Sequence, residues 1–356
     1  MFHSMSTLPF LYLLTITTPI FAATLQASVE QVVADYALST STSLPFPSAT
    51  QNPADTQKIM VADWSLGKGA IQDNPGNLAF VADPFPNASA PFPTGQNLSG
   101  PVLQARYPQG SFSYETGGSQ WYNLWNATAG AKFQTMLVSY EVAFDENFDW
   151  VKGGKLPGLR GSTKSNLAGC SSGKEKETNG SDCFSTRLMW RKNGAGEVYA
   201  SIPTANGLCS QEGVTCNSDT STSIQRGTFG FVSGRWNRVT LLVRLNDPPN
   251  VANGNIQLFY NDLKAIDQQG LQIRTNSQVY VNGFYFSTFF GGSDKTWETP
   301  RDAHTYYRNI RMWGSSAASN LTGNTVATAA ASRTTASGLG LFGGLALTGV
   351  AAALWI

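Results

Sequence analysis

Histidine is nearly absent from this 356-residue chain, and charged residues are few. The sequence contains 2 histidines, and Lys, Arg, Asp and Glu together account for 13% of it. One histidine, His3, lies in an N-terminal stretch that we expect to be removed, which leaves His304. A zinc site built from two or three histidines is therefore excluded. His304 has no evident partner in the sequence, so we expect it to be structural.

The balance of charge excludes two further classes of protein. The chain has 24 Lys and Arg against 23 Asp and Glu, and aromatic residues make up 12% of it. A disordered chain combines low hydrophobicity with a large net charge, and a general nucleic-acid binder carries a strong positive excess. The sequence has neither property, so we expect a folded protein with no nucleic-acid partner.

The N-terminus has the pattern of a secretory signal peptide. Residues 8–21 are an uncharged apolar run, followed by the small residues Ala22 and Ala23. The run is shorter than the roughly 20 residues of a membrane-spanning helix, although no Lys or Arg precedes it. We expect residues 1–22 to be a signal peptide, and the alternative is an N-terminal membrane anchor.

The C-terminus has the pattern of a glycosylphosphatidylinositol (GPI) attachment signal. Residues 315–338 are a spacer rich in Ser, Thr and Ala, and residues 339–356 are an uncharged apolar tail. Small residues, a polar spacer and a terminal tail are typical of this signal, whereas a membrane-spanning helix usually has flanking basic residues. We expect a secreted monomer anchored at the plasma membrane or cell wall. The alternative is an ordinary transmembrane helix.

Glycosylation sequons and an even number of cysteines fit the same compartment. The five Asn-X-Ser/Thr sequons predict a glycosylated surface protein and begin at Asn87, Asn97, Asn126, Asn179 and Asn320. Four cysteines in a secreted chain favour two disulfides. We prefer Cys170–Cys183 and Cys209–Cys216, because each closes a loop rich in Gly, Ser and Asn. A zinc site is disfavoured because no C-x2-C pair is present.

Strands dominate the middle of the chain. Apolar residues such as Met136, Val138 and Tyr140 alternate with their neighbours over residues 135–144, which is the period of a strand. Further β-rich runs are separated by turn signals, and no helical period extends over 12 residues between 100 and 313. We expect residues 101–314 to form an all-β domain, a jelly-roll β-sandwich of two antiparallel sheets.

Residues 23–100 are expected to be an N-terminal extension. Leu25, Val29 and Val32 recur at helical spacing and predict one short helix. Residues 39–50 are rich in Ser, Thr and Pro and indicate a linker. Five prolines between 83 and 101 predict an irregular arm.

Cations concentrate in one part of the β-rich region. Between Lys152 and Lys192, nine cations are opposed by three acids. If these strands are neighbours, one sheet face forms a cationic cleft that concentrates a polyanion. The alternative is that these side chains simply face water, as on many sheets.

Two segments of this region are candidates for a site. FDWVKGGKLPGLRG, residues 148–161, holds Lys155 and Arg160 among glycines that free the backbone and a proline that fixes it. In CFSTRLMW, residues 183–190, a strand places Ser185 and Arg187 on one face. A hairpin turning at Asn193 and Gly194 would bring Tyr199 close to Arg187 or Ser185.

The same segments resemble polysaccharide lyase family 14, particularly its fungal branch. The resemblance rests on GGKLPG (153–158), CFSTRLMWR (183–191) and EVYASIP (197–203), with further similarity in RYPQGS (106–111) and FYFSTFFGG (284–292). It covers about residues 100–313. Family 20 glucuronan lyases share the jelly-roll plan and are the near alternative.

The resemblance implies a metal-independent jelly-roll enzyme without a cofactor. It implies cleavage of uronic-acid polymers, alginate or glucuronan, by β-elimination, which gives unsaturated uronate ends. The family's catalytic lysine falls on Lys155, its Ser-x-Arg pair on Ser185 and Arg187, and its first tyrosine on Tyr199. The family's second tyrosine is replaced by Ser201.

The residues themselves suit this chemistry. Arg187 can pair with a carboxylate through two hydrogen bonds. Lys155 or Tyr199 could take the C5 proton if a cationic groove lowers its pKa, and which of them is base and which is acid stays open. Ser185 would orient the sugar. We expect Arg160, Ser201 and Arg191 to bind the acidic polysaccharide.

Two other functions are compatible with parts of the pattern. A retaining glycoside hydrolase needs two carboxylates about 5 Å apart, and the nearest candidates, Glu141, Asp145 and Glu146, have the wrong spacing. A non-catalytic surface protein could bind acidic glycans through the same cationic groove. The loss of the second tyrosine at Ser201 is compatible with this second alternative.

Overall fold

The computed structural model describes residues 26–91, 100–125, 132–163, 170, 179–217 and 221–326. The predicted signal peptide, the apolar tail and the sequons at Asn97 and Asn126 lie outside these residues. Within the described ranges, no helix is long and apolar enough to cross a membrane.

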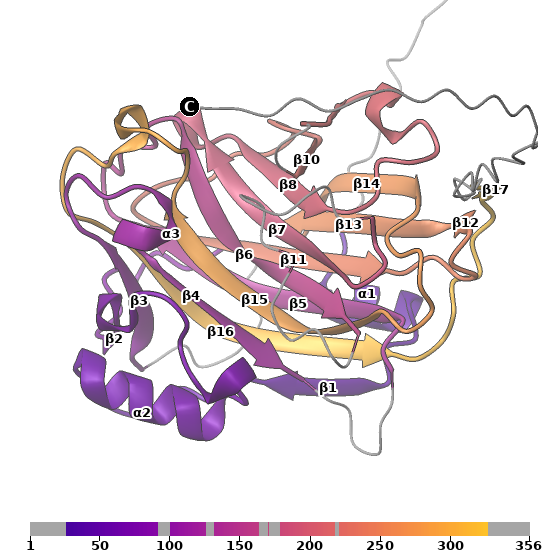
Figure 1. Ribbon diagram of the computed structural model, residues 1–356. Coiled ribbons are helices and arrows are strands. Elements are labelled where there is room, and N and C mark those ends of the chain that lie inside the picture. Colours follow the sequence, from indigo (N-terminus) through magenta and orange to yellow (C-terminus); the bar gives the residue numbers. More distant parts are fainter. Residues whose placement is uncertain are drawn as a thin grey trace, which may run out of the picture. The chain divides into compact units, whose positions relative to one another are not determined.

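Two antiparallel sheets make up the fold, so the predicted all-β jelly-roll sandwich is confirmed (Figure 1). The first sheet has, in order, β14 (Leu263–Leu271), β13 (Gly254–Tyr260), β11 (Trp236–Arg244), β5 (Thr135–Phe144), β16 (Ala303–Ser315), β3 (Val102–Tyr107) and β2 (Leu78–Val81), with β1 (Thr40–Ser43) also on β16. The second has β4 (Ser119–Leu124), β15 (Tyr280–Phe290), β6 (Gly153–Ser162), β7 (Cys183–Arg191), β8 (Gly196–Ser201), β10 (Thr222–Ile224) and β9 (Val214–Thr215).

Short elements complete the described chain. A separate pair joins β12 (Val251–Ala252) to β17 (Asn324–Thr325). The α-helices are α1 (Val29–Asp35), α2 (Pro53–Asp63) and α3 (Ser113–Thr116). The 3-10 turns are η1 (Gly67–Gly69), η2 (Pro75–Asn77), η4 (Lys192–Gly194), η5 (Leu208–Ser210) and η6 (Lys295–Trp297).

The core lies between the two sheets. On β5, the alternation predicted for residues 135–144 is confirmed, because Val138 and Tyr140 belong to the same buried cluster as Leu188 and Trp190 of β7. Apolar residues on the other face of β5 are also buried. Leu137 is covered by Val29 and Val32 of α1, the helix that the apolar spacing predicted.

The N-terminal residues are more ordered than the sequence indicated. We expected a linker over residues 39–50, and this is wrong for β1, which pairs along β16 from Thr40 to Ser43. Helix α2 was not predicted. It begins after Asn52, whose side chain accepts a hydrogen bond from the Asp55 amide, and ends before Trp64, which is fully buried in the core.

Both preferred disulfides are present. The Cα atoms are 5.7 Å apart in Cys170–Cys183 and 5.5 Å apart in Cys209–Cys216. The asparagines of the three described sequons, Asn87, Asn179 and Asn320, are exposed. Both observations suit an extracellular protein, and glycosylation itself stays a prediction.

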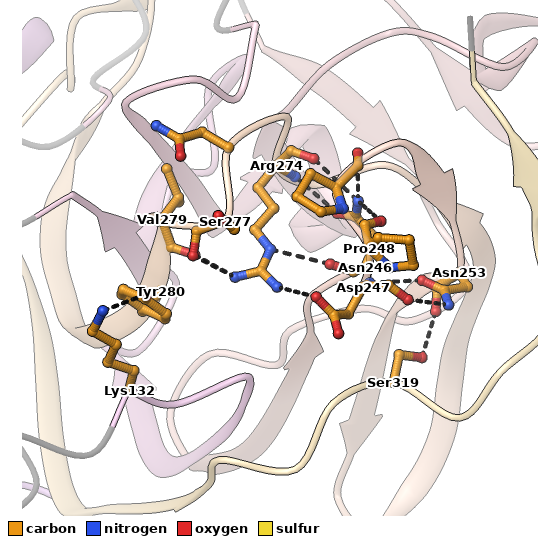
Figure 2. A network of polar contacts seen from close by, with 12 residues as sticks. Lys132, Asn246, Asp247, Pro248, Asn253, Arg274, Ser277, Val279, Tyr280 and Ser319 are labelled. Atoms are coloured by element: carbon orange, nitrogen blue, oxygen red, sulfur yellow. Dashed lines mark hydrogen bonds and ion pairs between the residues drawn. The ribbon is translucent and has the colours of Figure 1, made fainter.

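A buried arginine joins the loops at one end of the domain (Figure 2). Arg274 donates to the carbonyls of Asn246 (3.1 Å) and Val279 (2.8 Å) and to the carboxylate of Asp247 (3.0 Å). Asn253 bonds to Asp247 and, through its own carbonyl, to the Ser319 hydroxyl. The chain after β16, where we expected a spacer to begin, is therefore packed against the sheet loops.

Candidate active site

A bulge in β6 brings Lys155 and Arg160 to one face of the second sheet. Lys155 lies opposite Met189 of β7 and Arg160 lies opposite Ser185, so five steps along β6 match four along β7. In a regular strand, residues five apart point to opposite faces. The one extra residue restores the alternation and places both cations on the face of Arg187.

A hydrogen bond and a close approach of two strands fix the bulge. The Tyr140 hydroxyl, on β5 of the other sheet, donates a hydrogen bond to the Pro157 carbonyl at 2.8 Å. At Gly158, a Cβ atom would lie 1.9 Å from the Thr186 carbonyl oxygen, so a residue with a side chain does not fit there. The Gly- and Pro-rich motif is thus a fixed part of the sheet, and it sets the position of Lys155.

The predicted hairpin forms as expected. Arg187 of β7 pairs with Tyr199 of β8, and Ser185 pairs with Ser201. The turn between the strands includes Asn193 at φ 61°, a conformation that asparagine tolerates well. The prediction that Tyr199 lies close to Arg187 is therefore confirmed.

Lys155 is packed against Tyr199 and is almost completely buried. Its Nζ lies 3.2 Å from the centroid of the Tyr199 ring and 3.3 Å from the Met189 sulfur, and 7% of the residue is exposed. Burial, followed by the positive charges of Arg187 and Arg191, holds the pKa of Lys155 well below its usual range, and the Glu197 carboxylate opposes this shift. A lysine with a lowered pKa can be a neutral amine and accept a proton.

The hydroxyl groups of the site have defined partners. The Tyr199 hydroxyl accepts a hydrogen bond from the Ser221 amide at 3.2 Å, so its own proton is not used in that bond. The Ser185 hydroxyl donates to the Cys170 carbonyl at 2.9 Å. The Ser201 hydroxyl pairs with the hydroxyl of Ser221. Ser201 therefore supports the segment that holds the Tyr199 oxygen.

Arg187 lies in the middle of the site. Its Nη1 donates to the Ser287 hydroxyl of β15 at 3.0 Å, and its guanidinium lies 4.8 Å from the centroid of the Tyr285 ring. The side chain is buried. A buried guanidinium beside a lysine gives the site a strong positive potential, which suits a carboxylate ligand.

Arg191, which we expected to bind substrate, is engaged by an acid that the sequence did not reveal. Its Nε donates to the Glu197 carboxylate at 2.9 Å, and its Nη2 donates to the same oxygen. Ser223 (2.7 Å) and Arg226 contact the other oxygen. Burial alone would raise the pKa of Glu197, but its hydrogen bonds and the charge of Arg191 outweigh burial and lower it. Two signals pointed to Glu197: it begins the EVYASIP motif, and it shares a strand face with Tyr199.

Arg160 is held on one side only. Its Nη1 donates to the Asn282 side chain at 2.9 Å, and the guanidinium lies 5.0 Å from the centroid of the Tyr122 ring. Within the described chain, Nε and Nη2 of Arg160 have no hydrogen-bond partner. These two atoms form the side of a guanidinium that binds a carboxylate with two parallel bonds. Of the predicted binding arginines, Arg160 thus has two unused donors but is fully buried, whereas Arg191 is paired with Glu197.

Comparison with known proteins identifies the family. A family model described as Polysaccharide lyase 14 matches residues 95–310. The chain belongs to polysaccharide lyase family 14. The resemblance predicted from its motifs is confirmed, and the protein is a polysaccharide lyase.

Solved structures of lyases share the fold. The family 14 alginate lyase of Aplysia kurodai is 32% identical over 62% of this chain and 86% of its own, with a TM-score of 0.54. Another alginate lyase, Aly36B, is 17% identical over 80% of this chain and 98% of its own, with a TM-score of 0.53. That second likeness concerns the fold alone. No curated protein matches the chain.

The motifs of family 14 meet on one face of this protein. GGKLPG supplies Lys155, the Ser-x-Arg motif supplies Ser185 and Arg187, and the following strand supplies Tyr199. Their catalytic roles stay predictions. In the described part of the chain, no group of three His, Cys, Asp or Glu side chains could hold a metal ion.

His304 lies in the first sheet of this family 14 lyase, away from that face. It is the second residue of β16 and lies opposite Arg106 of β3. Its Nδ1 lies 3.1 Å from the Asp145 carboxylate, which also accepts a bond from the Tyr306 hydroxyl at 2.8 Å. These contacts suit the structural role that we expected.

Proposed function

We propose that the protein cleaves a uronic-acid polymer of the alginate or glucuronan type by β-elimination. The observation that carries the proposal is the packing of Lys155, whose pKa is lowered, against Tyr199 and beside Arg187. The similarity to the Aplysia kurodai alginate lyase supports a uronate substrate. The anionic substrate would occupy the face that carries Lys155, Arg187 and Arg160.

In the proposed reaction, the neutral Lys155 amine takes the C5 proton of a uronate residue. The electrons of that C–H bond form the C4–C5 double bond, and the bond between C4 and O4 breaks. Tyr199 gives its hydroxyl proton to the departing O4. Arg187 pairs with the carboxylate at C5 and stabilises the charge that develops there. The assignment of Lys155 as base follows from its lowered pKa, and that of Tyr199 as acid from its unused proton.

The carboxylates of the hydrolase alternative are occupied elsewhere. Glu141, in the first sheet, is buried and pairs with Arg238 at 3.1 Å and Arg308 at 2.7 Å. Asp145 is bonded to His304 and Tyr306. Two free carboxylates about 5 Å apart, which a retaining hydrolase needs, are therefore not offered by these residues.

One assay distinguishes a lyase from a hydrolase and from a binding protein. The secreted chain is incubated with polyglucuronate and, separately, with polymannuronate, while absorbance in the ultraviolet and reducing ends are both followed. We expect new absorbance from the unsaturated uronate on at least one polymer. Reducing ends without absorbance would indicate a hydrolase. The absence of both signals would indicate a binding protein without catalytic activity. Either of these two results would refute the proposed reaction.

Two substitutions beside Lys155 should shift the pH dependence in opposite directions. If neutral Lys155 is the active form, kcat/KM rises as the pH rises through its lowered pKa. Arg191 lowers that pKa and Glu197 raises it. Arg191→Met should therefore move the rise to higher pH, and Glu197→Gln should move it to lower pH. Profiles of kcat/KM against pH that shift in the same direction would contradict the role of Lys155 as base.

We also propose that the enzyme is secreted and held at the cell surface. The closed disulfides and the exposed sequon asparagines support this location. Treating intact cells with a phospholipase specific for GPI anchors should release lyase activity into the medium. Activity that stays with the cells after this treatment would argue against a GPI anchor.

A further inference from the structure

The hydrogen bonds of Arg187 lead to a residue outside the segment that matches the family. Arg187 donates to Ser287 at 3.0 Å, and the Ser287 hydroxyl donates to Oε1 of Gln120 at 3.0 Å. Nε2 of Gln120 donates to the Asp73 carboxylate at 2.8 Å. The family model begins at residue 95, so Asp73 belongs to the N-terminal part of the chain.

The N-terminal chain reaches this position by pairing with the edge of the second sheet. Leu66 bridges to Asn123 of β4, and Asp73 bridges to Gln120. The Asp73 amide donates to the Gln120 carbonyl at 3.2 Å, and the Asp73 carbonyl accepts from the Ser119 hydroxyl at 2.9 Å. Asp73 is thus held by backbone and side-chain bonds together, which fixes its carboxylate against the side chain of Gln120.

Asp73, Gln120, Ser287 and Arg187 form a hydrogen-bond relay. The Asp73 carboxylate sets the direction of every bond in it. A carboxylate only accepts hydrogen bonds, so Gln120 must turn its Nε2 toward Asp73. Its Oε1 then faces β15 and accepts from Ser287 and from the Tyr285 hydroxyl at 2.7 Å. Because the single hydrogen of Ser287 is used on Gln120, its oxygen is an acceptor for Arg187.

We propose that Asp73 is a positioning residue for the lyase reaction. Its carboxylate fixes the amide of Gln120, which orients Ser287 and Tyr285, and these two side chains hold the guanidinium of Arg187. The N-terminal extension therefore contributes to the carboxylate-binding part of the site. This inference rests on the proposed function, in which Arg187 pairs with the uronate.

A double-mutant cycle tests the relay. Asp73→Ala and Ser287→Ala are each expected to lower kcat about tenfold, the scale of losing a group that orients a functional residue. KM should change less, because the charge held by Arg187 grows in the transition state. Since both changes break one relay, the kcat of the double variant should be no lower than that of the less active single variant. Asp73→Asn keeps an acceptor for Gln120 but adds a donor that no longer fixes the direction of its amide, so its kcat should lie between those of Asp73→Ala and the wild type.

The matched control is Gln72→Ala, one residue away, whose side chain bonds only to the nearby Gly67 and Ala70 carbonyls in the described structure. It should leave kcat unchanged. Unfolding midpoints are measured for every variant. The relay would be overturned if the kcat losses of the two single variants multiplied in the double variant, or if Asp73→Ala kept the wild-type kcat. It would also be overturned if the loss of kcat followed the fall in the unfolding midpoint and Asp73→Asn restored none of it. A wild-type enzyme without lyase activity would instead overturn the proposed function.

Discussion

Replacing Lys155 with alanine is expected to lower kcat about 10³-fold, within the range that a general base contributes. The neighbouring cations offer no substitute, because the guanidinium groups of Arg187 and Arg191 have only donors and cannot accept the C5 proton. Tyr199 would still be present, but its hydroxyl is bonded to the Ser221 amide and is the acid of the proposed reaction. The rate is measured by ultraviolet absorbance on the polymer that the wild type cleaves.

Two variants separate the loss of the base from the loss of a charge. Lys152→Ala removes a lysine three residues away that is exposed and bonded to the Thr296 hydroxyl, and it should keep nearly full activity. Lys155→Arg keeps a cation but no group that can be neutral, so it should be as inactive as Lys155→Ala. Full activity in Lys155→Ala would show that the site has been assigned to the wrong residues.

Short-range patterns predicted the half of the site that one hairpin holds. Alternation along β7 placed Arg187 on one face with Ser185, and alternation along β8 placed Tyr199 on one face with Ser201. The turn at Asn193 set which residues of the two strands lie opposite each other. These features depend on residues close in sequence, for which backbone preferences and the period of a strand are sufficient. The preferred disulfides were predictable for the same reason.

Contacts between distant strands could not be predicted in this way. Gln120 and Ser287 are 167 residues apart, and nothing in either strand indicates that β4 and β15 are neighbours. Residues 39–50 had the composition of a linker, but β1 gains its hydrogen bonds from β16, a strand far away in the sequence, near the C-terminal end of the domain. Composition describes the local tendency of a segment, while the register of a sheet depends on all the strands that pack together.

Replacing Trp64 with alanine is expected to destabilise the whole lyase domain by about 3–5 kcal/mol. Trp64 is completely buried, lies 5.3 Å from Trp121 and 5.8 Å from Phe80 between ring centroids, and donates its indole N–H to the Pro45 carbonyl at 2.7 Å. The substitution leaves a cavity at the junction of the N-terminal chain and both sheets. The free energy of unfolding is measured in urea.

Val61→Ala is the matched control, because it lies in α2 just before Trp64 and is 44% exposed. It should change the free energy of unfolding by less than about 0.5 kcal/mol. A similarly small effect of Trp64→Ala would mean that residues 26–91 dock loosely on the domain. Loose docking would leave Asp73 without a fixed position on β4, so this stability measurement also bears on whether the N-terminal chain can hold Arg187 through Gln120.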